Sequence, residues 1–317
     1  MKKSINWQLL NELRTRFLDQ SPESKRRDYW DSAELLALYD QTFAQRIAWK
    51  WLAVLDELIR KQSLVFPKHP KILDWGCGSG IAARTFLKYA ENFGITEPEV
   101  FFFDRSKKAL SFAIEQVQQE FSEITAQVWD ANKDTPDILL VSHVLNEINE
   151  IQLQQLKQLT LQSSFTIWVE PGIYEVSRKL LECREFFKGD LHIIAPCPQQ
   201  GVCPMTQEQH THDWCHNFAP VPAEVFQSSF WSSFSKNLKI DLRSLPVSFL
   251  VLSQGNKKIP NIANRVIGKM KKFKPFQSAL VCTKAGSLEA CKVTKRRDPE
   301  LYKQLDKHDF CTSVPEH

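Results

Sequence analysis

The sequence has no long apolar run, no recognisable leader and no internal repeat. No stretch approaches the roughly eighteen uncharged apolar residues that a membrane-spanning helix requires, so we expect no membrane partner. The first twenty residues lack an apolar centre and carry Glu12 and Asp19, a pattern unlike a secretory or import peptide. The absence of a repeat excludes a repeat architecture. We therefore expect a soluble, cytoplasmic protein.

The arrangement of the eight cysteines is typical neither of a secreted disulfide-bonded protein nor of a structural zinc site. Without a signal peptide, eight cysteines in 317 residues argue against a secreted disulfide framework and favour thiols or metal ligation. The close Cys-x2–4-Cys pair that is typical of structural zinc is absent.

What the sequence does have is the composition of a globular protein, with 43% hydrophobic and 25% charged residues. Its length allows one large α/β domain with additions, or two domains. The net charge of +4 is unevenly distributed, because residues 254–317 hold 14 Lys and Arg against 6 Asp and Glu. A basic part on a slightly acidic body favours a polyanionic partner, with a solvated tail as the alternative.

The pattern of apolar residues divides the chain into helical and strand-forming parts. Residues 1–62 repeat apolar residues at spacings of three and four, which predicts helices. From Lys71 onward, short apolar runs alternate with helical stretches, which predicts a doubly wound parallel sheet. The resulting divisions are an N-terminal helical region at 1–66, an α/β core at 67–190 and 240–290, a cysteine-rich insertion at 191–239 and a basic tail at 291–317.

The most specific local motif is a glycine-rich turn in the run KILDWGCGSGIAARTFLKYA. A buried strand containing Asp74 leads into Gly76, Gly78 and Gly80, and a helix follows at once. Glycine lets the backbone turn tightly and approach a ligand, and the helix N-terminus favours an electronegative ligand group. Asp104, which closes the next strand, is an acid of the kind that holds ribose hydroxyls. Taken alone, the glycines would also suit a nicotinamide or flavin enzyme.

With Asp-x-Gly-x-Gly-x-Gly after the first strand and Trp129-Asp130 after the third, residues 70–175 resemble the class I S-adenosylmethionine-dependent methyltransferases. The resemblance implies S-adenosylmethionine as the cofactor and a Rossmann-like, seven-stranded sheet. The sixth and seventh strands would form a hairpin, which residues 248–253 and 278–283 could supply. The implied cofactor contacts are Asp74, Gly76, Gly78 and Gly80 to the methionine part, Asp104 to the ribose and Asp130 to the adenine amino group.

Residues after the fourth strand are the candidates for catalysis. Methyl transfer is an in-line displacement that mostly needs positioning, so the protein need supply little acid or base. Enzymes that methylate amino groups of bases often carry Asn/Asp-Pro-Pro-Tyr here, but this chain has SHVLNEI. His143, Asn146 and Glu147 could face the methyl group; alternatively, His143 and Asn146 only cap and orient the loop. The run VEPG at 169–172 predicts a turn at the pocket rim.

Residues 195–216, APCPQQGVCPMTQEQHTHDWCH, suit neither a helix nor a strand. Cys197, Cys203 and Cys215 are widely spaced, and prolines after the first two stiffen the loop. The pattern fits a metal site that a remote ligand completes, and thiolates beside Cys-Pro pairs fit an iron–sulfur cluster. Zinc remains the alternative because of His210, His212 and His216. Buried free cysteines are the third possibility.

The runs IIAPCPQQGVCP and WCHNF, following a methyltransferase core and VEPG, resemble the mitochondrial-ribosome small-subunit methyltransferase-like family and its bacterial relatives. The likeness spans most of the chain. It implies a bacterial cytoplasmic protein associated with the small ribosomal subunit and its rRNA, with no DNA partner expected. It also implies a [4Fe-4S] cluster held by Cys197, Cys203, Cys215 and Cys282, with Cys291 as a possible replacement for Cys282 and with Cys77, Cys183 and Cys311 as non-ligands.

The expected position of Cys282 bears on what a cluster could do. If residues 278–283 form the last antiparallel strand, Cys282 lies at the sheet edge away from the cofactor pocket. A cluster there would be too distant to reduce the cofactor, so radical chemistry is not expected. Its role would be to fix the insertion to the core.

Three functions follow: a methyltransferase acting on rRNA or a small-subunit protein, a catalytically inactive assembly or RNA-binding factor, and a small-molecule methyltransferase. Basic segments at 256–274 and 292–297 would engage phosphates, so binding should fall steeply with salt. Phe273 and Phe276 could stack on bases, although packing under the last strand is the alternative. The basic C-terminal part counts against a small-molecule substrate.

Overall fold

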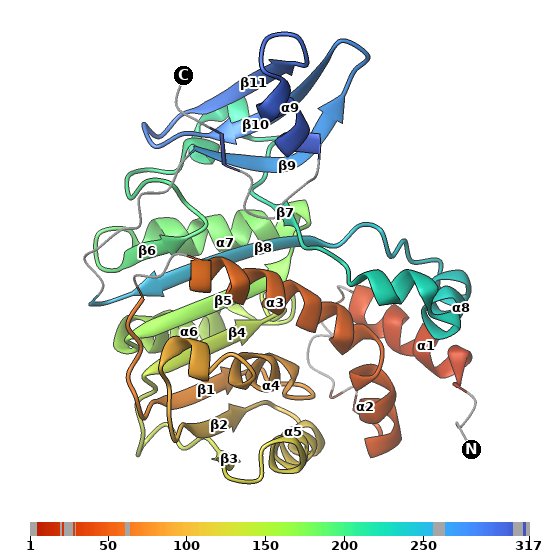
Figure 1. Ribbon diagram of the computed structural model, residues 1–317. Helices are drawn as coiled ribbons and strands as arrows, with labels where there is room; N and C mark the ends of the chain where they lie inside the picture. Colours follow the sequence, from red (N-terminus) through yellow and green to blue (C-terminus); the bar gives the residue numbers. More distant parts are fainter. Residues whose placement is uncertain are drawn as a thin grey trace.

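The computed structural model describes residues 5–19, 21, 28, 30–60, 64–255, 264–306 and 313–314. They form a large sheet with helices on both faces and a smaller sheet packed beyond one edge of it, at the top of Figure 1. The segment 256–263 and Cys311, both named among the sequence predictions, lie outside the described residues. No helix in the described part of the chain has the length and apolar character needed to cross a bilayer.

The large sheet has the strand order β3-β2-β1-β4-β5-β8-β6, with the short β7 paired to β8. Strands β1 to β5 pair in parallel, whereas β8 runs antiparallel to both β5 and β6. This confirms the predicted α/β class with a mostly parallel sheet. The strands are β1 (Lys71–Trp75), β2 (Glu99–Phe103), β3 (Thr125–Val128), β4 (Ile138–Ser142), β5 (Phe165–Pro171), β6 (His192–Ala195), β7 (Asn217–Phe218) and β8 (Pro246–Ser253).

Helices cover both faces of this sheet because its central strands are apolar on both sides. In β4, Ile138 and Leu140 join the core with α3, α4 and α5, whereas Leu139 and Val141 join the core with α6 and α7. Such continuous apolar strands are typical of a buried parallel sheet. The helices are α3 (Phe43–Arg60), α4 (Ile81–Leu87), α5 (Lys107–Glu120), α6 (Glu150–Gln162) and α7 (Tyr174–Phe187), with 3-10 turns at Glu91–Phe93, Pro204–Thr206, Glu208–His210 and Ala223–Gln227.

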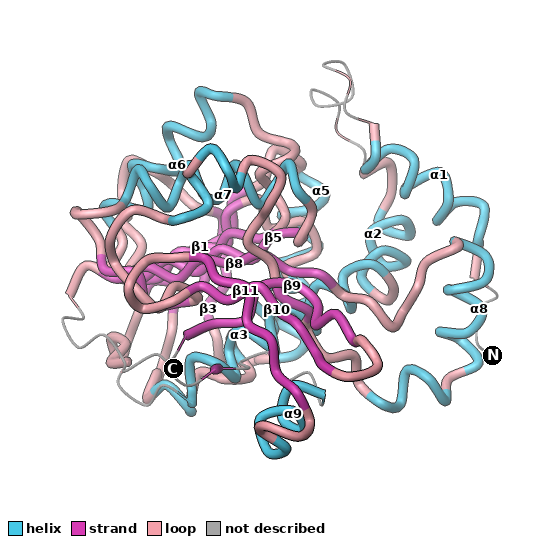
Figure 2. The backbone as a smooth tube through the Cα atoms, turned by 90° about the horizontal axis from the view of Figure 1, so that it is seen from above, coloured by secondary structure: helices cyan, strands magenta, loops and turns pink. Residues whose placement is uncertain are grey.

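Three further helices gather on one side of the molecule: α1 (Trp7–Leu18), α2 (Ala33–Asp40) and α8 (Ser229–Leu238) (Figure 2). The Ser32 hydroxyl accepts a hydrogen bond from the Leu35 backbone N–H and so caps the start of α2. Helix α1 contacts α8 and α2 within this group, and α2 contacts α3 and α5, which pack on the sheet. Helices therefore stand over the carboxyl ends of the first strands.

The smaller sheet has the order β11-β10-β9-β12 and is antiparallel. Its elements are β9 (Asn264–Lys272), β10 (Phe276–Cys282), β11 (Leu288–Thr294), α9 (Pro299–Asp306) and β12 (Ser313–Val314). One face packs on α9 through a small core that includes Met270, Val281, Val293 and Leu301. The range 291–317, expected as a basic tail, thus contributes to two strands and a helix.

The predicted hairpin of the large sheet is wrong in one strand. Residues 248–253 do form β8, but residues 278–283 lie mainly in β10 of the smaller sheet. The outer strand of the large sheet is instead β6, at the start of the range assigned to the cysteine-rich insertion. Strand β6 has only four residues and ends directly before Pro196. Because a proline-rich run follows it, the sequence pattern did not separate this strand from the insertion. The premise that placed Cys282 at the edge of the large sheet is therefore also wrong.

Candidate functional site

A cavity of about 430 Å³ lies between the carboxyl ends of β1, β2 and β4 and the helices α2 and α3. This volume is within the range of about 300–1,000 Å³ that is usual for small-molecule sites. Six of the predicted site residues line it: Gly76, Gly78, Asp104, His143, Asn146 and Glu147. The other three cofactor candidates, Asp74, Gly80 and Asp130, are not among its lining residues.

The glycine loop is held against the second strand and turns with a left-handed backbone. The N–H groups of Gly76 and Cys77 both donate to the Phe103 carbonyl, at 2.7 and 3.1 Å. Gly76 and Gly78 have φ values of 72° and 51°, which residues with a side chain rarely adopt. Gly80 has a different role, because a Cβ there would lie 2.9 Å from the Ala113 Cβ on α5. Two of the three glycines therefore shape the cavity, and the third permits close helix packing.

The three predicted acidic residues have different surroundings. Asp104 lines the cavity, and its two carboxylate oxygens accept hydrogen bonds from the N–H groups of Gly78 and Ser106, each at 2.9 Å. Asp74 is fully buried; its Oδ2 accepts from the Ala83 N–H at 3.1 Å, and its Oδ1 has no partner in the structure. Burial raises the pKa of Asp74 to about 8.

Asp130 lies outside the cavity on a half-exposed turn, where its Oδ1 accepts from the Asn132 N–H and its Oδ2 pairs with Lys133. Its predicted contact with an adenine amino group therefore has no counterpart in the cavity lining and stays a prediction.

His143 and Lys50 form a buried polar contact at the cavity wall. His143 Nε2 and Lys50 Nζ are 3.3 Å apart, and His143 is held there by a left-handed backbone with φ of 58°. Burial and, to a smaller extent, the nearby Arg46 together lower the pKa of Lys50 to about 7. Burial also lowers the pKa of His143 well below its usual value, followed by the effects of Lys50 and Arg46. At neutral pH this wall therefore carries the neutral imidazole of His143 beside the amine of Lys50, which gains or loses its proton near pH 7.

Sequence reasoning missed Arg46, Lys50 and the buried role of Glu170. Glu170 is not part of an exposed turn: its Oε1 accepts from the N–H groups of Val144 and Leu145, at 3.1 and 3.4 Å, and fixes the loop after β4. Burial raises its pKa to about 8. The signal for the other two was the spacing of Arg46 and Lys50 along an otherwise apolar helix, since residues four apart share one face.

Replacing Lys50 with methionine is expected to remove a pH dependence of stability. The folded pKa of about 7 lies below the ordinary 10.5, so between these values the unfolded state binds more protons than the folded state. The free energy of unfolding should therefore rise with pH in the wild type relative to the variant, by at most about 1.4 kcal/mol per pH unit. Urea unfolding between about pH 8 and 10 measures this difference. Lys133→Met, at an exposed site, is the control, and equal slopes in wild type and Lys50→Met would contradict the expectation.

The four predicted ligand cysteines gather between α7 and the smaller sheet. Cys203 and Cys282 share a buried cluster with Leu181 and Ile267, against which Cys215 packs. Burial raises the pKa of Cys282 to about 12, with further contributions from Cys197 and Cys203; burial raises that of Cys215, followed by all three other thiols. The described cysteines are free thiols.

The thiols are gathered but not arranged as ligands. Within the described ranges, no three histidine, cysteine, aspartate or glutamate side chains are placed to hold a metal ion. The histidines of this segment have other contacts: His210 Nδ1 pairs with Asp213 Oδ2 at 2.8 Å, and His216 Nδ1 lies 3.0 Å from the Trp214 carbonyl. These two histidines are therefore engaged elsewhere, and the carboxylate of Glu185, which accepts from the Cys203 N–H at 3.0 Å, lies close to the thiols.

Two arginines place positive charge beside these thiols. Burial alone would lower the pKa of Arg184, but the neighbouring Cys197 and Cys203 raise it. Arg265 on β9 is buried and forms a two-pronged ion pair with Glu57 of α3, with N–O distances of 2.8 and 3.0 Å. Arg265 also donates to the side-chain Oδ1 of Asn217 at 3.3 Å. A single buried network thus joins the smaller sheet, β7 and α3 beside the cysteines.

A family model described as mitochondrial small ribosomal subunit Rsm22 matches residues 37–313 of this chain. The chain belongs to that family. The match includes most of the cavity lining, the four gathered cysteines and strands β9 to β11 of the smaller sheet. It confirms the resemblance that the cysteine-rich run suggested. A comparison with curated proteins finds no match.

Several solved structures to which this chain shows a low similarity are described as methyltransferases. The plantazolicin methyltransferase BpumL, solved with S-adenosylhomocysteine, is 12% identical over 78% of this chain and 99% of its own, with a TM-score of 0.42. TrmK of M. capricolum is 9% identical over 64% and 68%, with a TM-score of 0.35, and an S-adenosylmethionine-dependent methyltransferase of Aquifex aeolicus is 16% identical over 46% and 83%, with a TM-score of 0.33. Similarities this low do not extend to the ligand or activity of this chain.

Proposed function

We propose that this protein binds S-adenosylmethionine in the cavity and methylates a component of the small ribosomal subunit, with rRNA as the favoured acceptor. The observation that carries the proposal is that one cavity joins the glycine loop and Asp104 to His143, Asn146 and Glu147. The family to which the chain belongs supports the ribosomal context.

In this proposal, the glycine loop and Asp104 bind the cofactor. Gly76 and Gly78 let the backbone approach the ligand without side chains between them. Each carboxylate oxygen of Asp104 accepts one backbone hydrogen bond and keeps capacity for a second, which ribose hydroxyls can donate. The backbone bonds hold Asp104 in place before the ligand arrives.

S-adenosylmethionine supplies a methyl group on a sulfonium, and the residues of this chain would position the acceptor. His143 and Lys50 form the cavity wall after β4. Near neutral pH, unprotonated Lys50 Nζ can accept a proton from an acceptor N–H or O–H, since the pKa of Lys50 is about 7. Methyl transfer by this route should become faster as pH rises through 7.

A second candidate function is an assembly factor that keeps the fold and the cofactor without turnover. It is favoured by Asp74 and Asp130, which do not line the cavity although the methyltransferase resemblance assigned them cofactor contacts. Radioactive methyl transfer onto small subunits from cells that lack the protein separates the two. Incorporation into RNA supports the enzyme, incorporation into protein changes the acceptor, and tight cofactor binding without incorporation supports the assembly factor.

Gly78→Ala is expected to weaken S-adenosylmethionine binding at least tenfold. Among the described residues the new Cβ meets nothing closer than 4.0 Å, so the loss would arise at the ligand and from a left-handed backbone. The matched control is Gly94→Ala, which has a φ of 69° and open space around it, remote from the cavity lining. Isothermal titration calorimetry measures both variants, and equal cofactor affinity in the two would exclude binding at this loop.

We further propose that Cys197, Cys203, Cys215 and Cys282 hold a [4Fe-4S] cluster, with zinc as the alternative. Four free thiols from distant parts of the chain are gathered here; burial and then neighbouring thiols raise the pKa values of Cys215 and Cys282, and two arginines beside them can balance thiolate charge. None of the four lines the cavity, so we assign the cluster a structural role. Such a centre would tie β10 of the smaller sheet to the 197–215 loop.

A further inference from the structure

A row of aromatic rings runs along the outside of the segment that contains Cys215. The Tyr174 and Trp214 ring centroids are 5.9 Å apart, Trp214 and His216 stack at 4.7 Å with an interplanar angle of 15°, and His216 and Phe218 are 5.4 Å apart. Trp214, His216 and Phe218 are each half-exposed. We call Tyr174, Trp214, His216 and Phe218 the aromatic row.

The row arises from alternation along an extended segment. In WCHNF, Cys215 and Asn217 face inward, where Cys215 joins the other thiols and Asn217 contacts Arg265. Residues at every second position of extended backbone share a side, so the intervening rings face outward. The same five residues therefore provide an inner polar network and an outer row of rings.

One end of the aromatic row reaches the rim of the cavity. The indole N–H of Trp214 donates to the Gly172 carbonyl at 3.1 Å, and the flanking residues Pro171 and Ile173 line the cavity. Tyr174 follows directly and donates from its hydroxyl to the Thr211 carbonyl at 2.6 Å. These bonds fix the first two rings beside the cavity mouth.

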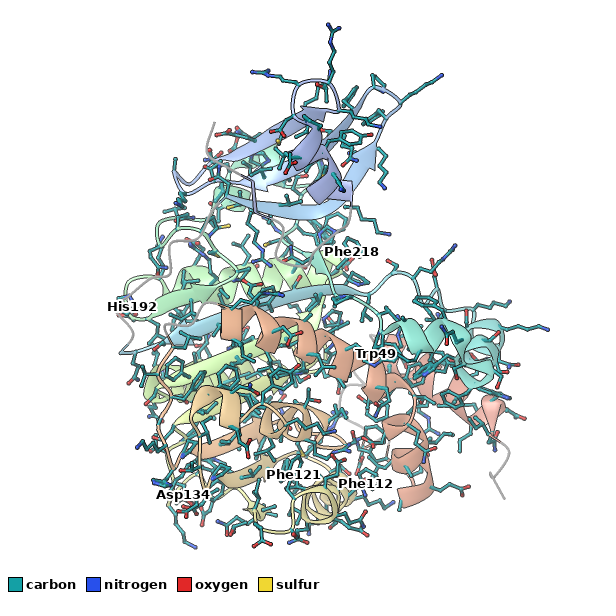
Figure 3. All side chains as sticks on the ribbon, in the orientation of Figure 1. Trp49, Phe112, Phe121, Asp134, His192 and Phe218 are labelled. Carbon is teal, nitrogen blue, oxygen red and sulfur yellow. The ribbon has the colours of Figure 1, made fainter. Side chains whose placement is uncertain are left out.

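The other end reaches the smaller sheet. Phe218, labelled in Figure 3 between the two sheets, lies under Lys269 of β9, with Nζ 4.6 Å from the ring centroid. Lys271 shares this face of β9, because Met270 between them packs toward α9. In the sheet register Lys271 pairs with Ser278, and Ser278 pairs with Lys292. The face of the smaller sheet opposite α9 therefore carries three lysines, two on β9 and one on β11, and they lie next to the end of the aromatic row.

Two more rings lie at the far end of this face, at the tip of the β9–β10 hairpin. Phe273 and Phe276 stack with centroids 4.6 Å apart, and Lys292 Nζ lies 4.0 Å from the Phe276 centroid. Phe273 is 48% exposed. We call Lys269, Lys271, Lys292, Phe273 and Phe276 the basic face.

We propose that the aromatic row and the basic face form one binding path for single-stranded RNA, which leads the strand to the mouth of the cavity. The role of this path in methyl transfer rests on the proposed function, whereas the binding of RNA along the path does not. Successive rings can stack on unpaired bases, and lysines beside them neutralise phosphates. An acidic peptide or lipid headgroup would satisfy the lysines but has no planar groups for the rings.

The test is fluorescence anisotropy with a labelled, unstructured RNA of about twelve nucleotides, titrated at several salt concentrations. Phe218→Leu keeps an apolar side chain but removes the ring and should weaken binding about 5- to 150-fold. The triple variant Lys269→Gln/Lys271→Gln/Lys292→Gln should make the slope of log affinity against log salt shallower by about 2.

The matched control is Phe186→Leu, which removes an exposed ring that also carries a lysine, with Lys157 Nζ 4.6 Å from its centroid. It should leave RNA affinity unchanged. S-adenosylmethionine affinity is measured on the same samples. Retained cofactor affinity in Phe218→Leu shows that its core is folded. A wild type that does not bind the cofactor refutes the cofactor proposal independently of the RNA result. Weak RNA binding by the wild type, equal losses in Phe218→Leu and Phe186→Leu, or preference for duplex RNA or phosphatidylserine vesicles would overturn the path.

Discussion

Serine at any one of positions 197, 203, 215 or 282 is expected to abolish metal incorporation and to lower the melting temperature. Protein purified without air should contain iron and acid-labile sulfide, because four thiols that gather from distant parts of the chain suit such a cluster. Metal binding contributes directly to folding when the ligands come from separate segments. Each kcal/mol lost lowers the melting temperature by about 2–4 °C in domains of about 150–250 residues.

The matched controls are Cys183→Ser and Cys291→Ser. Cys183 on α7 is buried in the core between that helix and the large sheet, Cys291 is half-buried on β11, and neither shares the buried cluster of Cys203 and Cys282. Both variants should keep the metal. If the protein contains zinc and no sulfide, a zinc site replaces the iron–sulfur proposal. If Cys291→Ser loses the metal and Cys282→Ser keeps it, Cys291 is the fourth ligand. Full metal content in all single variants would refute a metal site.

Arg265→Met is expected to lower the free energy of unfolding by about 3–5 kcal/mol, because it breaks the buried ion pair that Arg265 forms with the Glu57 carboxylate. The two side chains are 6% and 4% exposed, so water cannot replace the lost charge. Removing both partners in Glu57→Met/Arg265→Met should recover most of the loss, since a packed apolar pair avoids the uncompensated charge. Urea unfolding of the two variants measures the difference.

The control for this pair is Arg243→Met. Arg243 pairs with Asp241 at 3.0 Å, but both side chains are exposed, 82% and 53%. Exposed ion pairs contribute little to stability, so this variant should unfold close to the wild type. If Arg265→Met were no more costly than Arg243→Met, the buried network would not join the smaller sheet to α3 in the way its geometry indicates.

Local patterns with a strong physical cause could be predicted from the sequence. The glycine loop needs left-handed backbone at Gly76 and Gly78, and both residues line the cavity as expected. The central strands were recognisable because they are apolar on both faces. The widely spaced cysteines also indicated a three-dimensional cluster, and the thiols of residues 197 to 282 are gathered in the structure.

Features that depend on pairing between distant segments could not be predicted. Residues 276–282, FQSALVC, end in an apolar run that suits a strand in either sheet, so their partners β9 and β11 were not determined by the pattern. The apolar spacing over residues 1–62 predicted helices but did not show that Lys50 is buried. Its burial depends on the loop after β4, where His143 lies 93 residues away in the chain.

Helix α3 carries a consequence for how the two ends of the protein communicate. Lys50 and Glu57 are seven residues apart on one side of this buried helix, or about 10 Å along its axis. The first faces the cavity and the second is clamped by Arg265. A displacement of the clamp therefore shifts the cavity wall as a rigid rod would. If docking of the smaller sheet and ligand binding in the cavity favour the same position of α3, each makes the other more favourable by the same factor, as thermodynamic linkage requires.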